Sequence, residues 1–172
     1  MSRILGIDPG FGRMGWAIVD RCGGKLVAVK LGLIETFPGP ICDRLVQIGR
    51  EFEAIVDEFK PEFVVTERLI FAANRTTAFD VSKALGVVLY LSGKRGLGWQ
   101  EYASSEIKQS ICGNGNADKN QVGYMVSKII GIDKVPGPDD VADALAIALT
   151  HAMRARLTSG GKELVPARAG KS

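Results

Sequence analysis

The chain has 172 residues, which suits one domain with a sizeable core. Its composition, 46% hydrophobic and 24% charged, is ordinary for a globular protein and excludes a disordered chain, while the net charge of +3 is too small by itself to indicate a nucleic-acid partner. No apolar run approaches the roughly 20 residues of a membrane span, and no signal-peptide pattern begins the chain, so we expect a soluble, cytoplasmic protein that does not bind membranes. The widely spaced Cys22, Cys42 and Cys112 favour a reducing compartment, and we assign them no chemistry.

The first predicted element is a buried strand, the apolar run 4–7, which ends at Asp8 before a Pro-Gly turn. Two further β-prone runs follow, at 14–20 and 26–35. Gly23-Gly24 between them favours a hairpin, because glycine readily adopts positive φ. These three strands are therefore expected to form an antiparallel meander.

The middle of the chain alternates helices and strands. The spacing of apolar residues predicts an amphipathic helix over 41–59. The continuous apolar run 63–66 predicts a strand buried on both faces, parallel to the first because a helix precedes it, and it ends at Glu67. A long helix over 72–91 and a fifth strand over 99–103 are expected next.

Three more helices are predicted towards the end of the chain. A short one covers 104–108, another covers 118–130, and the last begins at Asp139 or Asp140. His151, the only histidine, lies near the other end of the last helix, where we expect a packed side chain rather than a metal ligand.

These elements define an α/β fold with a five-stranded mixed sheet: a three-strand antiparallel meander plus two parallel strands, flanked by helices. We expect one domain over residues 1–156. Residues 157–172 are Gly-rich and charged without periodicity, which predicts a disordered basic tail.

Basic residues are concentrated in one internal segment. Residues 68–95 contain five basic side chains against one acidic side chain, Asp80: Arg68, Arg75, Lys83, Lys94 and Arg95. This pattern predicts a basic face beside Glu67. The alternative is that these are ordinary solvated helix charges with no partner.

Four carboxylates occupy comparable positions. Asp8 and Glu67 end two strands that are expected to be neighbours, and Asp140 and Asp143 lie three residues apart at the start of the last helix. Each has a structural alternative: a turn residue for Asp8, a surface residue for Glu67, and helix caps for the other two. Clustered carboxylates repel unless a hard divalent cation neutralises them, and two Mg²⁺ ions are suitable. The sequence lacks a catalytic Cys motif, paired His ligands and a Gly-rich phosphate loop. The reaction that these carboxylates suit best is therefore metal-assisted phosphodiester hydrolysis.

Five features occur together in order: Ile4-Leu5-Gly6-Ile7-Asp8-Pro9-Gly10, Thr66-Glu67, Lys108-Gln109, Lys119 and Asp140-Val141-Ala142-Asp143-Ala144-Leu145-Ala146-Ile147-Ala148. The ordered set resembles the RuvC family of Holliday junction resolvases over about residues 3–153. The resemblance implies an RNase H-like fold, a homodimer, and symmetric Mg²⁺-dependent nicking of four-way DNA junctions in recombination and repair. It also implies the branch-migration proteins RuvA and RuvB as partners and a bacterial, nucleoid-associated location.

By position, the resemblance implies that Asp8, Glu67, Asp140 and Asp143 are catalytic and bind two Mg²⁺ per subunit, with Mn²⁺ as a substitute. It assigns Lys108 and Lys119 to the scissile DNA, and we add Arg75 as a DNA contact. The sequence departs from the family after Glu67, where Arg68-Leu69-Ile70-Phe71 stands in place of Gln, an aliphatic residue and Phe.

We therefore predict that Phe71, rather than a residue at the usual aromatic position, stacks on bases near the cut; the alternative is a core or dimer contact. Three other functions are considered. One is another RNase H-like nuclease, because such nucleases share a similar first strand and turn. The second is an actin-like ATPase or sugar kinase, which needs two such domains. The third is a junction-binding module without catalysis.

Overall fold

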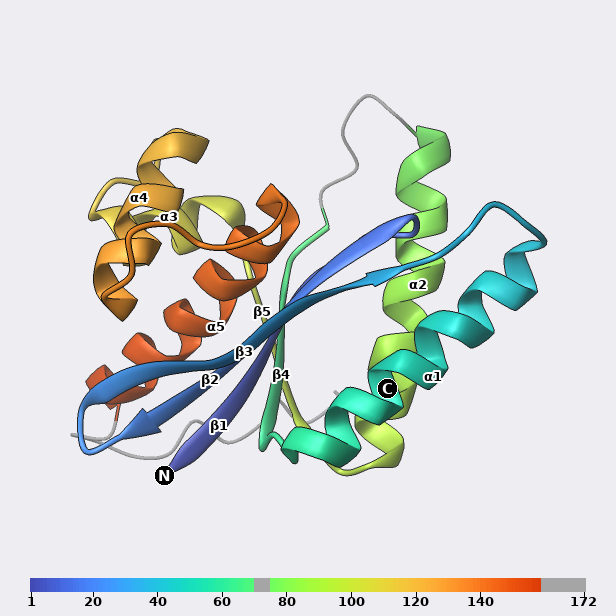
Figure 1. Cartoon of the computed structure of the whole chain (residues 1–172), viewed down its shortest axis with the longest axis horizontal. Coiled ribbons are helices and arrows are strands. Elements are labelled where there is room, and N and C mark those ends of the chain that lie inside the picture. The colour runs from blue at the N-terminus through green and yellow to red at the C-terminus, as the bar shows by residue number, and fades with distance from the viewer. Residues whose placement is uncertain (70–74, 159–172) are drawn as a thin grey trace, which may run out of the picture.

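The computed structural model describes residues 1–69 and 75–158 and is organised around one mixed sheet (Figure 1). The strand order is β3-β2-β1-β4-β5. The strands are β1 (Ser2–Asp8), β2 (Arg13–Cys22), β3 (Lys25–Glu35), β4 (Phe63–Glu67) and β5 (Gly98–Tyr102). The first three form an antiparallel meander, and β4 pairs in parallel with both β1 and β5. The predicted sheet is confirmed, including the strand β4 with a buried centre.

Helices cover both faces of the sheet. They are α1 (Ile41–Phe59), α2 (Arg75–Lys94), α3 (Ser104–Cys112), α4 (Lys119–Ile130) and α5 (Asp139–Thr158). Figure 1 shows α1 and α2 on one side of the sheet and α3, α4 and α5 on the other, and each side has its own buried apolar cluster. The predicted helix over 72–91 is observed from Arg75, because residues 70–74 lie outside the described part.

The prediction for α3 was too short. The helix continues four residues past Lys108 and ends at Gly113, whose φ of 70° closes it in the left-handed conformation. Its buried residues are Ile107 and Ile111, four positions apart on one face. Packing of this face against α5 therefore extends the helix to the first glycine.

Two glycines allow α5 to lie directly on the sheet. A Cβ atom on Gly6 in β1 would overlap the carbonyl oxygen of Ala144, and one on Gly15 in β2 would overlap that of Asp140. Glycine removes both clashes, so the backbone of α5 can approach the ends of these strands closely. This contact fixes the start of α5 next to the end of β1.

His151 is buried in the packing of α5. Its Nδ1 lies 3.0 Å from the hydroxyl of Tyr102, and its ring packs on Phe63 with centroids 4.9 Å apart. Burial lowers the pKa of His151 to about 4, so the ring is neutral at pH 7. The prediction that His151 is packed inside the protein is confirmed.

No helix in the described part of the chain is long and apolar enough to cross a membrane. The helix α5 runs two residues past the predicted domain end at residue 156. The rest of the predicted tail, 159–172, lies outside the described residues, so its disorder stays a prediction.

Candidate active site

The four predicted carboxylates converge at one end of the sheet. Because β1 and β4 pair in parallel, their carboxyl ends place Asp8 beside Glu67. The start of α5, seated on β1 and β2 through the two glycines, adds Asp140 and Asp143. All four are close enough that the charges of the other three raise the pKa of Asp8.

The site strongly disfavours negative charge. Burial, and after it the charge of Asp143, raises the pKa of Asp8 to about 7. Burial also raises the pKa of Glu67, although a hydrogen bond from Ser104 opposes this shift. Burial raises the pKa of Asp143 as well, and there Lys119 opposes the shift through a hydrogen bond and its charge. A positive charge bound here would therefore offset both desolvation and mutual repulsion.

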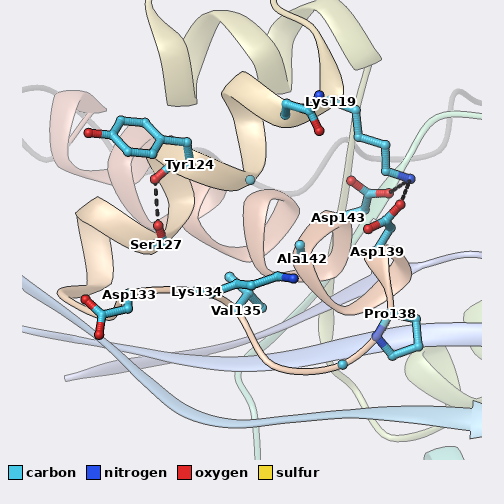
Figure 2. A pocket seen from close by; sticks show the side chains of 13 residues that line it. Lys119, Tyr124, Ser127, Asp133, Lys134, Val135, Pro138, Asp139, Ala142 and Asp143 are labelled. Carbon is cyan, nitrogen blue, oxygen red and sulfur yellow. Dashed lines mark hydrogen bonds and ion pairs between the residues drawn. The ribbon is translucent and has the colours of Figure 1, made fainter.

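Two basic side chains of the protein already contact the cluster. The Nζ atom of Lys119 lies 3.2 Å from Oδ2 of Asp143 and 3.3 Å from Oδ2 of Asp139, as Figure 2 shows. Nη2 of Arg13 lies 3.2 Å from Oδ2 of Asp140. That Oδ2 atom is buried and accepts no hydrogen bond, so the Arg13 contact is an ion pair without hydrogen-bond geometry.

Lys108 faces the same site from α3. A pocket of about 230 Å³ has Lys108, Lys119, Glu67 and Asp143 in its wall, together with Ser104. The two lysines that the sequence assigned to DNA thus lie on the rim of the carboxylate site. Their ammonium groups are the type of side chain that contacts DNA phosphates.

The structure does not place the other two predicted DNA contacts. Phe71 lies outside the described residues, so its base-stacking role stays a prediction. Arg75 is the first residue of α2, and its side chain also lies outside what is described.

The predicted basic face on 68–95 is largely neutralised. Arg68, Lys83 and Arg95 each form ion pairs, with Glu101, with Asp80, and with both Glu53 and Asp57, respectively. These pairs favour the alternative that the segment carries ordinary surface charges.

Sequence reasoning missed Arg13, Ser104 and Asp139. Ser104 follows β5, whose carboxyl end meets the same sheet edge as Glu67, and strand order alone could have placed it there. Asp139 directly precedes Asp140, and it was considered only as a helix start. Nothing in the sequence indicates the pairing of Arg13 with Asp140, because it arises from the seating of α5 on β2.

The donor set suits a hard divalent cation. The site offers carboxylate oxygens from two strand ends and one helix, raised pKa values, and the unsatisfied Oδ2 atom of Asp140. Within residues 1–69 and 75–158, however, no three His, Cys, Asp or Glu side chains are arranged closely enough to hold an ion. The side chain of Lys119, which pairs with Asp143, is 59% exposed.

Comparison with known proteins gives one family. Residues 4–151 match the family model described as crossover junction endodeoxyribonuclease RuvC. Relatives of that name include the Chloroflexus aggregans protein, 43% identical over 89% of this chain and 94% of the relative, and the Brevibacillus brevis protein, 41% identical over 87% and 91%.

Solved structures agree with this result. The structure described as Thermus thermophilus RuvC in complex with Holliday junction substrate superposes with a TM-score of 0.86 and 34% identity, covering 92% of this chain and 98% of that one. The yeast mitochondrial Holliday junction resolvase Ydc2, 14% identical with a TM-score of 0.67 over 92% and 84%, shows a shared fold.

Proposed function

This chain belongs to the RuvC family of crossover junction endodeoxyribonucleases, and we propose that it resolves four-way DNA junctions by paired, metal-dependent cuts during recombination and repair. The observation that carries the proposal is the convergence of four carboxylates beside two lysines at the carboxyl edge of the sheet. Oxygen donors and phosphate-binding cations are the two requirements of metal-assisted phosphodiester hydrolysis.

We propose that Asp8, Glu67, Asp140 and Asp143 would hold two Mg²⁺ ions, with Mn²⁺ as a substitute. When bound, such a pair supplies an activated water and stabilises the leaving oxygen. Lys108 on the α3 side would hold the phosphate backbone across the site.

Lys119 can pair either with the carboxylates of the site or with a DNA phosphate. Without DNA it pairs with Asp139 and Asp143, and its side chain is 59% exposed, so it can turn to a phosphate. The move would replace one ion pair with another and release Asp143. Lys119 would therefore bind DNA and also keep the carboxylates neutralised until DNA arrives.

We expect Lys119→Ala to weaken junction binding and to reduce the slope of log affinity against log salt by about 1, as the loss of one phosphate contact requires. Fluorescence anisotropy on labelled junctions from low to high salt measures both quantities. Lys25→Ala is the matched control, because Lys25 is an exposed residue at the start of β3, at the end of the sheet away from the carboxylates. An unchanged slope in Lys119→Ala would remove this residue from the interface.

An apolar groove between α1 and α2 suits a second copy of the chain. It has a volume of about 610 Å³ and is lined by Leu45, Val46, Val87, Tyr90 and Leu91 among others. Val46 and Tyr90 are 51% and 69% exposed. A four-way junction has two-fold symmetry, and paired cuts need two sites related by the same axis. We infer that this groove is the contact between the two copies of a homodimer.

We also propose the cellular setting that the resemblance implies. The partners would be the branch-migration proteins RuvA and RuvB, and the location would be the bacterial cytoplasm, at the nucleoid.

A gel assay on synthetic four-way junctions tests the proposed function. We expect symmetric nicks when Mg²⁺ is present and none after the metal is removed with EDTA. Binding should survive the removal, because lysine contacts do not need the metal. Binding without cutting in Mg²⁺ or Mn²⁺ would instead support the non-catalytic junction module, and hydrolysis of ATP without any junction binding would support the ATPase alternative.

A further inference from the structure

A second cleft adjoins the candidate active site. It lies between α4 and the segment that leads into α5, has a volume of about 400 Å³, and is shown in Figure 2. Lys119 and Asp143 line both this cleft and the pocket that contains Glu67 and Lys108. The two hollows therefore meet at the Lys119–Asp143 ion pair, and a strand lying across the carboxylates could continue from one into the other.

Lys134 supplies a cation in this cleft. It is exposed, and it has no ion-pair partner among residues 1–69 and 75–158. Figure 2 shows its ammonium group extending toward Ala142 of α5, with the carboxylate of Asp133 at the opposite end of the cleft. The other two acidic residues of the cleft, Asp139 and Asp143, are already paired with Lys119 at 3.3 Å and 3.2 Å. Lys134 is thus positioned to meet an anion that enters from the catalytic side.

The shape and lining of the cleft suit an unpaired nucleotide. Its volume falls at the low end of the roughly 300–1,000 Å³ of small-ligand pockets, so it is too small to enclose a duplex. Asn120 and Tyr124 also line it and are exposed, which offers an amide and an aromatic ring to a base. The base-stacking role predicted for Phe71 would open the junction near the cut, and unpaired nucleotides would then lie beside the carboxylates.

We propose that this cleft binds a nucleotide of the cleaved strand adjacent to the scissile phosphate, and that Lys134 contacts the backbone phosphate of that nucleotide. The inference rests on the proposed junction-cutting function and adds a site on the opposite side of the carboxylates from Lys108. The strand would then cross three lysines in order: Lys108, Lys119 and Lys134.

Junction binding by Lys134→Ala tests the contact. In EDTA, where no cutting is expected, the Kd should rise several-fold and the salt slope should fall by about 1. Lys25→Ala is the matched control. Lys25 begins β3 and pairs with Cys22, the last residue of β2, next to the start of β1. It therefore lies at the end of the sheet away from the carboxylates. We expect its Kd and slope to match those of the unaltered protein.

A substrate series locates the contact. Phosphates near the cut are replaced one at a time by neutral methylphosphonates, and each junction is measured with the unaltered protein and with Lys134→Ala. Replacing the phosphate at one or two adjacent positions on one side of the cut should abolish the difference in Kd between the unaltered protein and Lys134→Ala. A difference that persists equally at every position, or a Lys134→Ala protein that behaves like Lys25→Ala, would overturn the inference. Failure of the unaltered protein to bind junctions would instead overturn the proposed function, so the two failures are distinguishable.

Discussion

Asp8→Asn is expected to abolish junction nicking while leaving junction binding largely intact. The substitution removes a carboxylate from the centre of the proposed metal site but removes no phosphate contact. We expect the rate to fall by more than the roughly 10- to 100-fold that is typical when an outer partner of a metal ligand is lost. The measurement is single-turnover cleavage in Mg²⁺, with binding measured in parallel by anisotropy in EDTA.

The same variant should be more stable than the unaltered protein when metal is absent. The pKa of Asp8 is raised from an unfolded value near 3.8 to about 7, so ionising this group in the folded protein is unfavourable. For a raised carboxyl pKa, stability is lost as the pH increases from about 4 to 7, and the loss is complete above that range. At pH 8 in EDTA, Asp8→Asn should therefore have a higher Tm, and Mg²⁺ should raise that Tm less than it raises the Tm of the unaltered protein.

Asp43→Asn is the control for the loss of one negative charge, because Asp43 is an exposed residue in the first turn of α1. It should change neither cleavage nor the effect of Mg²⁺ on Tm. Normal cleavage by Asp8→Asn would remove Asp8 from the catalytic site. A large fall in its Tm would mean that the lost activity reports unfolding.

The sequence predicted the elements that carry the site because their signals are local. The apolar runs that end at Asp8 and at Glu67 define strands that are buried at their centres, and such runs form only where a strand crosses the core. The helix between them requires a parallel pairing, which puts both carboxylates at one edge. The order of elements alone therefore brought two of the four carboxylates together.

What the sequence did not predict depends on contacts between distant segments. The ion pair of Arg13 with Asp140 exists because Gly15 allows α5 to lie on β2. No pattern in the sequence around either residue predicts this contact. The charge count over 68–95 likewise suggested a basic face, whereas Arg95 pairs with acidic residues of α1. A count of charges does not show which of them a neighbouring helix neutralises.

Tyr90→Glu is expected to convert the protein to a monomer and to uncouple the two cuts. Tyr90 lines the α1–α2 groove and is 69% exposed, so the substitution should leave the folded chain and its Tm unchanged. In a two-fold dimer the new carboxylate would be buried twice, once from each copy, in a contact that is largely apolar, and removing a charge from water costs several kcal/mol.

Sedimentation measures the oligomeric state, and a plasmid with an extruded four-way junction measures the coupling. The unaltered dimer should release linear plasmid through paired cuts, while Tyr90→Glu should yield little product, chiefly nicked circles. Val27→Glu is the matched control, because Val27 is a 49% exposed apolar residue on β3, away from the groove. A Tyr90→Glu protein that remains dimeric would show that the subunits meet elsewhere. A monomeric Tyr90→Glu protein that still releases as much linear plasmid would show that paired cutting does not need the dimer. Two independent monomers would then cut both strands as efficiently as two sites related by one axis.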